Sequence, residues 1–357
     1  MDDARGQDDG RDGQTPDKGA PKPIAIGLQG GGAHGAFAWG VLDRLLEDGR
    51  IEVEGISATS AGAMNAAVLA YGLLQGGSDG ARTALRDFWR DISRSAAAHN
   101  PFRKLPWEKH FHPGHSLEHS PMFLLTDWWL RLLSPYEFNP LNVNPLRDVL
   151  ARHVDFAALR QSCPIRLYLC ATNVQSGKMR IFSSEEMSID AVMASACLPL
   201  LFQAVQIDGE YYWDGGYVGN PAIFPLIYHC GTRDVVIVHI NPILRKGVPK
   251  TASEILNRIN EVSFNSTLMR ELRTIGVVTS MIQQGKLSGG GLKEVMIHSI
   301  RSDETMSALG ISSKFNADWD FLSLLHEQGR AQAETWLQEN YQHIGLRSSV
   351  DLQKEFL

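Results

Sequence analysis

The residues best suited to chemistry lie in three short segments, and the first is a run of glycines. Gly30, Gly31 and Gly32 are followed by Ala33-His34-Gly35. Consecutive glycines at the start of a helix expose backbone N–H groups, where the partial positive charge of the helix collects. Such a loop binds an anion, which is either the phosphate of a nucleotide or the oxyanion of an acyl-transfer intermediate. A tight turn without a ligand is the alternative.

The second segment, Ala58-Thr59-Ser60-Ala61-Gly62, contains a candidate nucleophile. A serine between small residues, where a strand passes into a helix, is typical of a nucleophile elbow, because that turn is too sharp for bulky neighbours. Ser60 is therefore the predicted nucleophile. The alternative is a serine close to a helix N-cap.

The third segment contains a candidate base, because a hydroxyl is a weak nucleophile until a base removes its proton. Asp208-Gly209 predicts a two-residue hairpin, and Asp214 then comes at the end of its second strand, before Gly215-Gly216. The alternative for Asp214 is a turn cap. A Ser-Asp-His triad that uses His229, His239 or His298 is the rival mechanism, although His239 lies in a run typical of a buried strand.

In this order and spacing, with Asn220-Pro221 behind the third segment, the motifs closely resemble patatin-like phospholipases of the bacterial type over about residues 24–240. The resemblance implies a lipid acyl hydrolase on a three-layer α/β/α sandwich with a mostly parallel central sheet. It also implies a Ser60–Asp214 dyad without histidine, in which N–H groups of Gly30, Gly31 and Gly32 form the oxyanion hole. The expected substrate is a phospholipid or another acyl ester, and no cofactor or metal is implied.

The sequence departs from the family pattern at two positions. His34 stands where the family commonly has Arg or Lys, and Ala58 stands where it commonly has Gly. Because histidine titrates near neutrality, we expect positive charge beside the glycine loop to disappear as the pH rises. The change at Ala58 is sterically mild and does not predict a loss of activity.

Two functions from other classes remain as alternatives. A dinucleotide-binding module would use the glycine loop for a pyrophosphate and Glu52 or Glu54 for the ribose, but it leaves Ser60 and Asp214 without a role. A catalytically inactive lipid-binding protein is the other alternative.

The elements that position these motifs follow from apolar patterning. Buried strands are predicted over 23–29, 51–57, 165–172 and 234–240, and helices over 37–46, 62–75, 252–284 and 317–342. Alternating strands and helices indicate an α/β fold, with a sheet that ends near residue 240. The predicted division is a disordered polar tail (1–22), a catalytic domain (23–245) with an aromatic-rich insertion (99–145), and a helical C-terminal extension (246–357).

The insertion contains an element that is apolar on nearly all sides, over 122–133, with Trp128 and Trp129. A lid or lipid-contacting element explains it, and a core helix or dimer contact is the alternative. His99, His110, His112, His115 and His119 lie nearby without cysteines or a carboxylate at metal-binding spacing, so no metal site is predicted.

Composition excludes some partners. The chain has 357 residues, 43% of them hydrophobic, and a formal net charge of −6, so it lacks the basic excess of a nucleic-acid-binding protein. Four cysteines without C-x-x-C spacing indicate thiols in a reducing compartment, and the polar N-terminus does not resemble a signal peptide. We expect a cytoplasmic protein with peripheral membrane contact, and an oligomer is compatible with the sequence.

Overall fold

The computed structural model of the protein describes residues 20–99, 117, 120, 132–287 and 292–356. Most of the predicted N-terminal tail lies outside these residues. So do Trp128, Trp129 and most of the apolar element at 122–133, as well as the predicted histidine cluster except the backbone of His99.

One mixed sheet of eight strands forms the centre of the molecule, in the order β5-β6-β3-β2-β1-β7-β8, with β4 also paired to β3. The pairs formed by β1 with β2 and β7, by β2 with β3 and by β7 with β8 are parallel, and β3–β4, β3–β6 and β5–β6 are antiparallel. The strands are β1 (Lys22–Leu28), β2 (Ile51–Ala58), β3 (Arg166–Asn173), β4 (Met179–Ser183), β5 (Val205–Ile207), β6 (Glu210–Asp214), β7 (Asp234–Val238) and β8 (Met296–Ile300).

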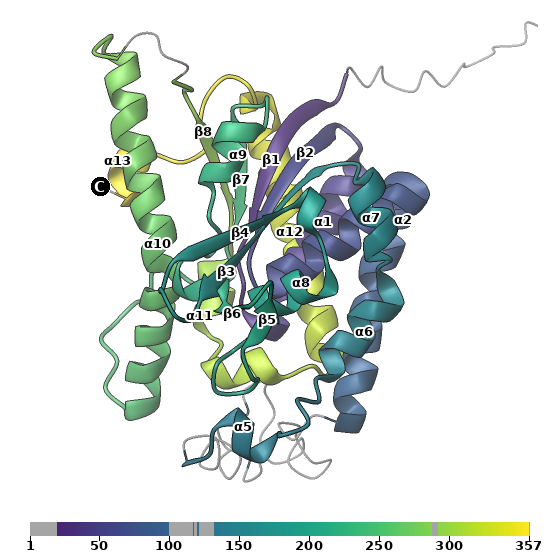
Figure 1. Cartoon of the computed structure of the whole chain (residues 1–357). Helices are drawn as coiled ribbons and strands as arrows, with labels where there is room; N and C mark the ends of the chain where they lie inside the picture. Colours follow the sequence, from purple (N-terminus) through teal and green to yellow (C-terminus); the bar gives the residue numbers. More distant parts are fainter. Residues whose placement is uncertain (1–19, 100–116, 118–119, 121–131, 288–291, 357) are drawn as a thin grey trace, which may run out of the picture.

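Helices cover both faces of this sheet (Figure 1). One face carries α1 (Gly35–Asp48), α2 (Ala61–His99), α6 (Pro145–His153), α7 (Phe156–Ser162), α8 (Ile189–Ser195) and α12 (Trp319–Asn340). The other carries α9 (Phe224–His229), α10 (Ala252–Gln283) and α13 (Leu352–Phe356). The remaining elements of the described residues are short: α5 (Pro135–Phe138), α11 (Asp303–Ser307), and the 3₁₀ turns η1 (Gly32–His34), η2 (Ser184–Glu186), η3 (Gly215–Tyr217), η4 (Ile311–Phe315) and η5 (Tyr341–His343).

The central strands are buried because helices pack on both of their faces. Ile24, Ile26 and Leu28 of β1 are fully buried, as are Val236 and Val238 of β7. Near-continuous apolar runs of this kind are what a parallel sheet between two helical layers requires. The predicted three-layer α/β/α sandwich is therefore confirmed, together with a helical C-terminal region.

Helices α1 and α12 pack so closely that glycines line their contact. A Cβ atom on Gly40 would lie 1.9 Å from the backbone oxygen of His326, and one on Gly329 would lie 2.0 Å from the oxygen of Phe37. Only residues without a side chain allow this approach of two helix backbones. Helix α12 is thus an integral part of the helical layer that contains α1.

The predicted end of the sheet near residue 240 is wrong. Strand β8 extends the sheet beyond β7, with Asp234 paired to Met296 and Val238 to Ile300. This five-residue strand follows a long helix, and a short apolar run carries too weak a pattern to identify it. The helix predicted over 62–75 is present, and non-helical backbone at Gly76 and Gly77 separates it from a second helical segment of α2 that runs to His99.

No helix among the described residues has both the length and the apolar character needed to span a bilayer.

Candidate functional site

Ser60 lies at the sharp turn between β2 and α2. Its backbone φ is 58°, in the left-handed region that non-glycine residues rarely adopt, and its N–H donates to Ser195 Oγ at 3.0 Å. Gly62, two residues on, packs against β1, where a Cβ atom would lie 2.6 Å from the oxygen of Leu28. A strained backbone conformation held by such packing is typical of functional sites. The turn therefore has the geometry that the small-residue pattern predicted.

The glycine loop follows β1 and lies directly against this turn. A Cβ atom on Gly30 would lie 2.5 Å from Ser60 Cβ, so any larger residue would displace the serine. The Gly30 N–H donates to Asn220 Oδ1 at 2.6 Å and is therefore not free to bind an anion. Among the described residues, the N–H groups of Gly31 and Gly32 have no hydrogen-bond partner. Of the three predicted donors, the Gly30 N–H is therefore occupied and those of Gly31 and Gly32 are available, while their binding of an oxyanion stays a prediction.

Asp214 ends β6, and its side chain is fully buried. Its N–H donates to the oxygen of Cys197 at 2.8 Å, and its Oδ1 accepts from the N–H of Gly216 at 2.7 Å. The other oxygen, Oδ2, has no hydrogen-bond partner in the described part of the chain. A buried carboxylate oxygen without a partner is costly and therefore requires an explanation.

Burial raises the pKa of Asp214 to about 6, and the Ser60 hydroxyl, the Gly216 N–H and the charge of Lys314 limit the rise. The Ser60 hydroxyl is thus close enough to the carboxyl to affect its pKa, although the two do not form a fully aligned hydrogen bond. Catalytic hydrogen bonds are often loose in the absence of substrate.

The topology explains why residues so distant in sequence meet. Leu28 of β1 pairs with Ala58 of β2, so the glycine loop and Ser60 emerge side by side from parallel strands. Ala58 pairs in turn with Leu169 of β3, and Asp214 pairs with Ala171, two residues farther along β3. All three motifs therefore lie at the same end of the sheet.

The residues of the rival hypotheses lie elsewhere. His229, His239 and His298 do not line the cavity at Ser60. His298 Nε2 is 2.9 Å from Oδ1 of Asp234, at the start of β7 and so at the opposite end of the sheet. The Glu54 carboxylate accepts hydrogen bonds from the N–H groups of Gly231 and Thr232, which precede β7. It therefore lies toward the end of the sheet opposite the glycine loop.

The expectation that His34 carries a titrating charge near neutrality is wrong. The ring is 3% exposed, with Nε2 2.8 Å from Ser313 Oγ. Burial, together with the nearby charge of Lys314, lowers the pKa of His34 to about 3. His34 is therefore neutral at physiological pH, because its surroundings offer a hydrogen bond but no opposing charge.

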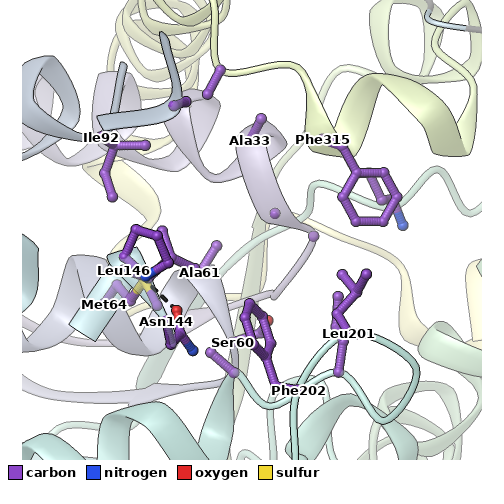
Figure 2. Close-up of a pocket in the computed structure, with 18 of the residues that line it drawn as sticks. Ala33, Ser60, Ala61, Met64, Ile92, Asn144, Leu146, Leu201, Phe202 and Phe315 are labelled. Carbon is purple, nitrogen blue, oxygen red and sulfur yellow. Dashed lines mark hydrogen bonds between the residues drawn. The ribbon is translucent and has the colours of Figure 1, made fainter. Parts of the chain in front are cut away.

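A cavity of about 780 Å³ opens at Ser60 (Figure 2). The side chains of Met64, Ile92 and Leu146 lie on one side of it and those of Leu201 and Phe202 on another. Gly31, Gly32 and Lys314 also line it. An apolar cavity with a few polar groups at one point is suited to a ligand with a long hydrocarbon part.

Sequence reasoning missed three residues of this site. Asn220 was noted only as part of a motif, yet its side-chain oxygen accepts a hydrogen bond from the Gly30 N–H. The Ser195 hydroxyl accepts a hydrogen bond from the N–H of Ser60. Lys314, from the C-terminal region, places a positive charge at the cavity. Asn220 could have been suspected from its position behind Asp214, whereas neither Ser195 nor Lys314 lies in a recognisable motif.

The described residues contain no group of three or more His, Cys, Asp or Glu side chains arranged to hold a metal ion. All four cysteines are free thiols, and burial raises the pKa of Cys197 to about 12 and that of Cys230 to about 11.

Comparison with solved structures finds distant similarity to two bacterial structures. VipD from Legionella pneumophila matches with 16% identity and a TM-score of 0.40, over 90% of this chain and 67% of that one. The heterodimeric complex ExoU-SpcU from the type III secretion system of Pseudomonas aeruginosa matches with 16% identity and a TM-score of 0.35, over 90% of this chain and 52% of that one. The chain thus spans about two thirds of the first protein and about half of the second.

No curated protein sequence matches this chain. The model of the patatin-like phospholipase family, however, matches residues 27–227, which make up more than half of the chain and include the glycine loop, Ser60 and Asp214. The chain belongs to the patatin-like phospholipases, a family of lipid-hydrolysing esterases.

Proposed function

We propose that this protein hydrolyses fatty-acyl esters through an acyl-Ser60 intermediate, with Asp214 as the base. The observation that carries the proposal is the buried Oδ2 of Asp214, which has no partner among the described residues and belongs to a carboxyl whose pKa responds to the Ser60 hydroxyl. An acceptor without a hydrogen bond, beside a serine on a strained turn that lines the cavity, is what a proton transfer from that serine needs.

In the first half of the reaction, Ser60 Oγ attacks the ester carbonyl carbon while Asp214 Oδ2 takes the hydroxyl proton. The carbonyl oxygen becomes negatively charged, and the N–H groups of Gly31 and Gly32 donate to it. Preorganised donors of this kind stabilise the transition state because they need no rearrangement. The bond to the leaving alcohol then breaks, and Asp214 returns the proton to that alcohol.

In the second half, water replaces the alcohol. Asp214 removes a proton from a water molecule, whose oxygen attacks the acyl-serine carbonyl. Collapse of the tetrahedral intermediate breaks the bond to Ser60 Oγ, which regains its proton from Asp214, and the fatty acid leaves. Every proton is accounted for with one carboxyl group, so no histidine is required.

The apolar cavity favours a substrate with a fatty-acyl chain, either a phospholipid or another acyl ester, taken from a lipid surface. Its lining includes Met64, Phe88, Trp89, Ile92 and Leu146. Product analysis with phospholipids, lysophospholipids and neutral esters, each with chains of several lengths, identifies the preferred substrate.

Labelling with a fluorophosphonate probe tests the nucleophile. We expect the purified protein to be labelled, Ser60→Ala to be unlabelled, and Asp214→Asn to be labelled much more slowly because its serine is no longer activated. Ser263→Ala, at an exposed serine on α10, is the matched control and should be labelled normally.

Two outcomes would contradict the proposal. Labelling that persists in Ser60→Ala would place the reactive group elsewhere. A protein that binds lipid but shows neither labelling nor ester hydrolysis would be the catalytically inactive lipid-binding protein that the sequence also allowed.

A further inference from the structure

Lys314 is a cation in the cavity that the family motifs do not include. It lies on η4, outside the region that the family model matches, and it lines the cavity together with Ser60, Gly31 and Gly32. Its backbone oxygen is 2.4 Å from the point where a Cβ atom on Gly32 would lie. The residue therefore packs directly on the glycine loop.

The groups that contact the Lys314 ammonium are uncharged. Its Nζ donates to Asn241 Oδ1 at 2.9 Å and to Asn260 Oδ1 at 3.2 Å, and it lies 5.4 Å from the ring centre of Phe264. In the described part of the chain it forms no ion pair. A lysine ammonium has three donors, so one N–H remains for a ligand.

The charged and titratable groups around Lys314 leave its charge unneutralised. Glu261 on α10 forms ion pairs with Arg245 at 2.5 Å and with Arg258 at 3.2 Å. Asp214 on β6 is the other carboxylate that acts on it, and His34 on η1 is neutral. A partly buried cation without a paired carboxylate favours binding of an anion.

Asn241 connects this cation to the loop. Its Nδ2 donates to the oxygen of Gly30 at 2.9 Å while its Oδ1 accepts from Lys314. The ring of His34 bonds to Ser313, the residue before Lys314. The histidine that replaces the family's usual cation thus supports the segment that brings a lysine to the same loop.

We propose that Lys314 binds a negatively charged oxygen of the substrate or of the reaction intermediate in this cavity. The inference rests on the proposed ester hydrolysis for the identity of that substrate. The anionic oxygen comes either from the acyl carbonyl, as the oxyanion and then the fatty-acid carboxylate, or from the phosphate of a phospholipid.

Steady-state kinetics with Lys314→Met, Lys314→Arg and the exposed control Lys286→Met separates these sources. If the acyl oxygen is the ligand, Lys314→Met lowers kcat on a neutral monoacylglycerol on the order of 10²-fold, as for loss of an oxyanion donor, and Lys314→Arg restores part of it. If the phosphate is the ligand, only the KM for a lysophospholipid rises. Unchanged kinetics on both substrates would overturn the proposal.

The pH profile provides a signature that a purely structural lysine would lack. Burial lowers the pKa of Lys314 to about 8, while Glu261 and Asp214 oppose the change. Activity on the neutral ester should therefore fall as the pH rises through about 8. In Lys314→Met this fall should be absent, and the rise at acidic pH should move upward because the cation no longer lowers the pKa of Asp214. A profile unchanged by the substitution would count against a charged role in catalysis.

A binding measurement tests the inference without catalysis. Calorimetry at pH 7 compares dodecanoate with dodecanol, in the unmodified protein and in Lys314→Met. We expect the substitution to weaken the binding of dodecanoate about tenfold and to leave the affinity for dodecanol unchanged. Equal weakening of both ligands, or of neither, would overturn the proposal. If the unmodified protein binds in the expected way but hydrolyses no ester, the anion site stands and the proposed function fails.

Discussion

At the scale of single residues, the site depends on how burial changes acids and bases. An aspartate in water has a pKa near 3.9 and is a poor base for an alcohol. Full burial raises the pKa of Asp214 to about 6, and the same effect keeps His34 neutral. A base works best when its pKa lies near the working pH, so the depth of Asp214 is itself part of the proposed mechanism.

The first prediction concerns the acid side of the pH profile. Asp214 accepts a proton only when ionised, so kcat/KM should rise as the pH increases through about 6 and level off before the fall expected near pH 8. Release of fatty acid, measured by chromatography between pH 4.5 and 7.5, checks this. Asp190→Asn, at an exposed carboxylate, should show the same profile. A midpoint near 4 would mean that an ordinary exposed carboxylate is the base.

The second prediction concerns the contact of Gly30 with Ser60. In Gly30→Ala the new Cβ atom would lie 2.5 Å from Ser60 Cβ and 2.8 Å from the oxygen of Thr59, so the nucleophile must shift. A shift of that size should lower kcat on the order of 10²-fold with little loss of lipid binding. Gly231→Ala, where the nearest atom is 3.4 Å away, is the control. Full activity in Gly30→Ala would refute the importance of this contact.

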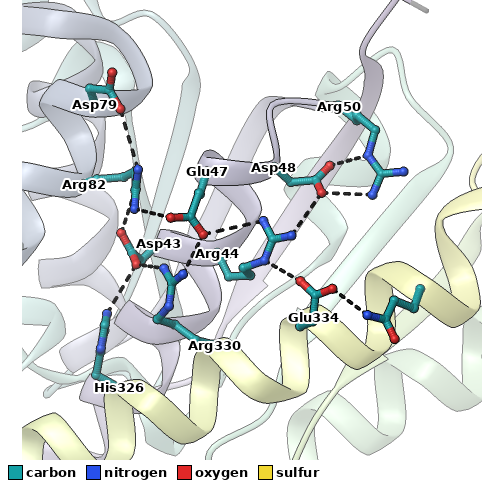
Figure 3. A network of polar contacts seen from close by, with 11 residues as sticks. Asp43, Arg44, Glu47, Asp48, Arg50, Asp79, Arg82, His326, Arg330 and Glu334 are labelled. Atoms are coloured by element: carbon teal, nitrogen blue, oxygen red, sulfur yellow. Dashed lines mark hydrogen bonds and ion pairs between the residues drawn. The ribbon is translucent and has the colours of Figure 1, made fainter. Parts of the chain in front are cut away.

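At the scale of elements, α12 is held on α1 and α2 by a network of ion pairs (Figure 3). Arg82 on α2 bonds to Asp43 on α1 at 2.8 Å, and Arg330 on α12 bonds to the same carboxylate. Arg44 reaches Glu334 at 2.5 Å. Asp43 is 7% exposed, so its interactions are less screened by water than those of an ordinary surface pair.

The third prediction is that Asp43→Asn destabilises the fold. Loss of the charge leaves two arginines without their shared partner, and the free energy of unfolding should fall by about 1.5–3 kcal/mol at pH 7. Urea unfolding followed by circular dichroism measures it. Asp190→Asn, which removes one partner of an exposed pair with Arg147, should change stability much less.

The same residue predicts a dependence of stability on pH. Burial acts to raise the pKa of Asp43, but hydrogen bonds from His326 and Arg82 and the charge of Arg330 outweigh it, so the pKa lies below its ordinary value of 3.8. Its contribution is therefore fully present above about 3.8 and is lost as the pH falls through the lower pKa of the folded protein. Between pH 5 and pH 3, the unmodified protein should lose more stability than Asp43→Asn.

The fourth prediction concerns the glycine contacts between α1 and α12. A methyl group at residue 40 would meet the backbone oxygen of His326 at 1.9 Å, so Gly40→Ala must push the two helices apart. We expect a loss of about 1–3 kcal/mol in unfolding free energy by the same urea assay. Gly76→Ala is the control, since a Cβ atom there would have no neighbour within 4 Å. Equal stability of the two variants would contradict the packing argument.

At the scale of the whole molecule, the region after residue 245 completes both the core and the cavity. Strand β8 covers the edge of β7, and Phe321, Leu322 and Leu325 of α12 belong to the same buried cluster as the strands of the sheet. Lys314 brings charge to the site from this region. The division into a catalytic domain and an extension at residue 245 stays a prediction, and these contacts argue that the two parts depend on each other.

The fifth prediction follows from those contacts. A chain that ends at residue 245 would expose the edge of β7 and the face of α1 that α12 covers, so we expect it to lose cooperative unfolding and to be digested rapidly by protease. Near-ultraviolet circular dichroism and limited proteolysis, compared with the full chain, check this. A stable fragment with a sharp unfolding transition would show that the extension is dispensable for folding.

The sequence by itself determined the elements whose conformation depends on their immediate neighbours. The hairpin turn at Asp208-Gly209 and the sharp turn at Ser60 were both predicted, and each contains a residue with a positive φ. Such turns are governed by a few adjacent residues, so they can be recognised locally. The order of the three motifs was also sufficient to indicate the family.

Only the tertiary structure decided the charges of the site and the availability of its donors. The neutral state of His34, the raised pKa of Asp214 and the occupied N–H of Gly30 all depend on burial and on groups that lie one hundred to almost three hundred residues away in the chain. Lys314 follows from no motif, because its position comes from the packing of η4 on the glycine loop. Burial and electrostatic interactions act through space, and the distances that govern them exist only in the folded chain.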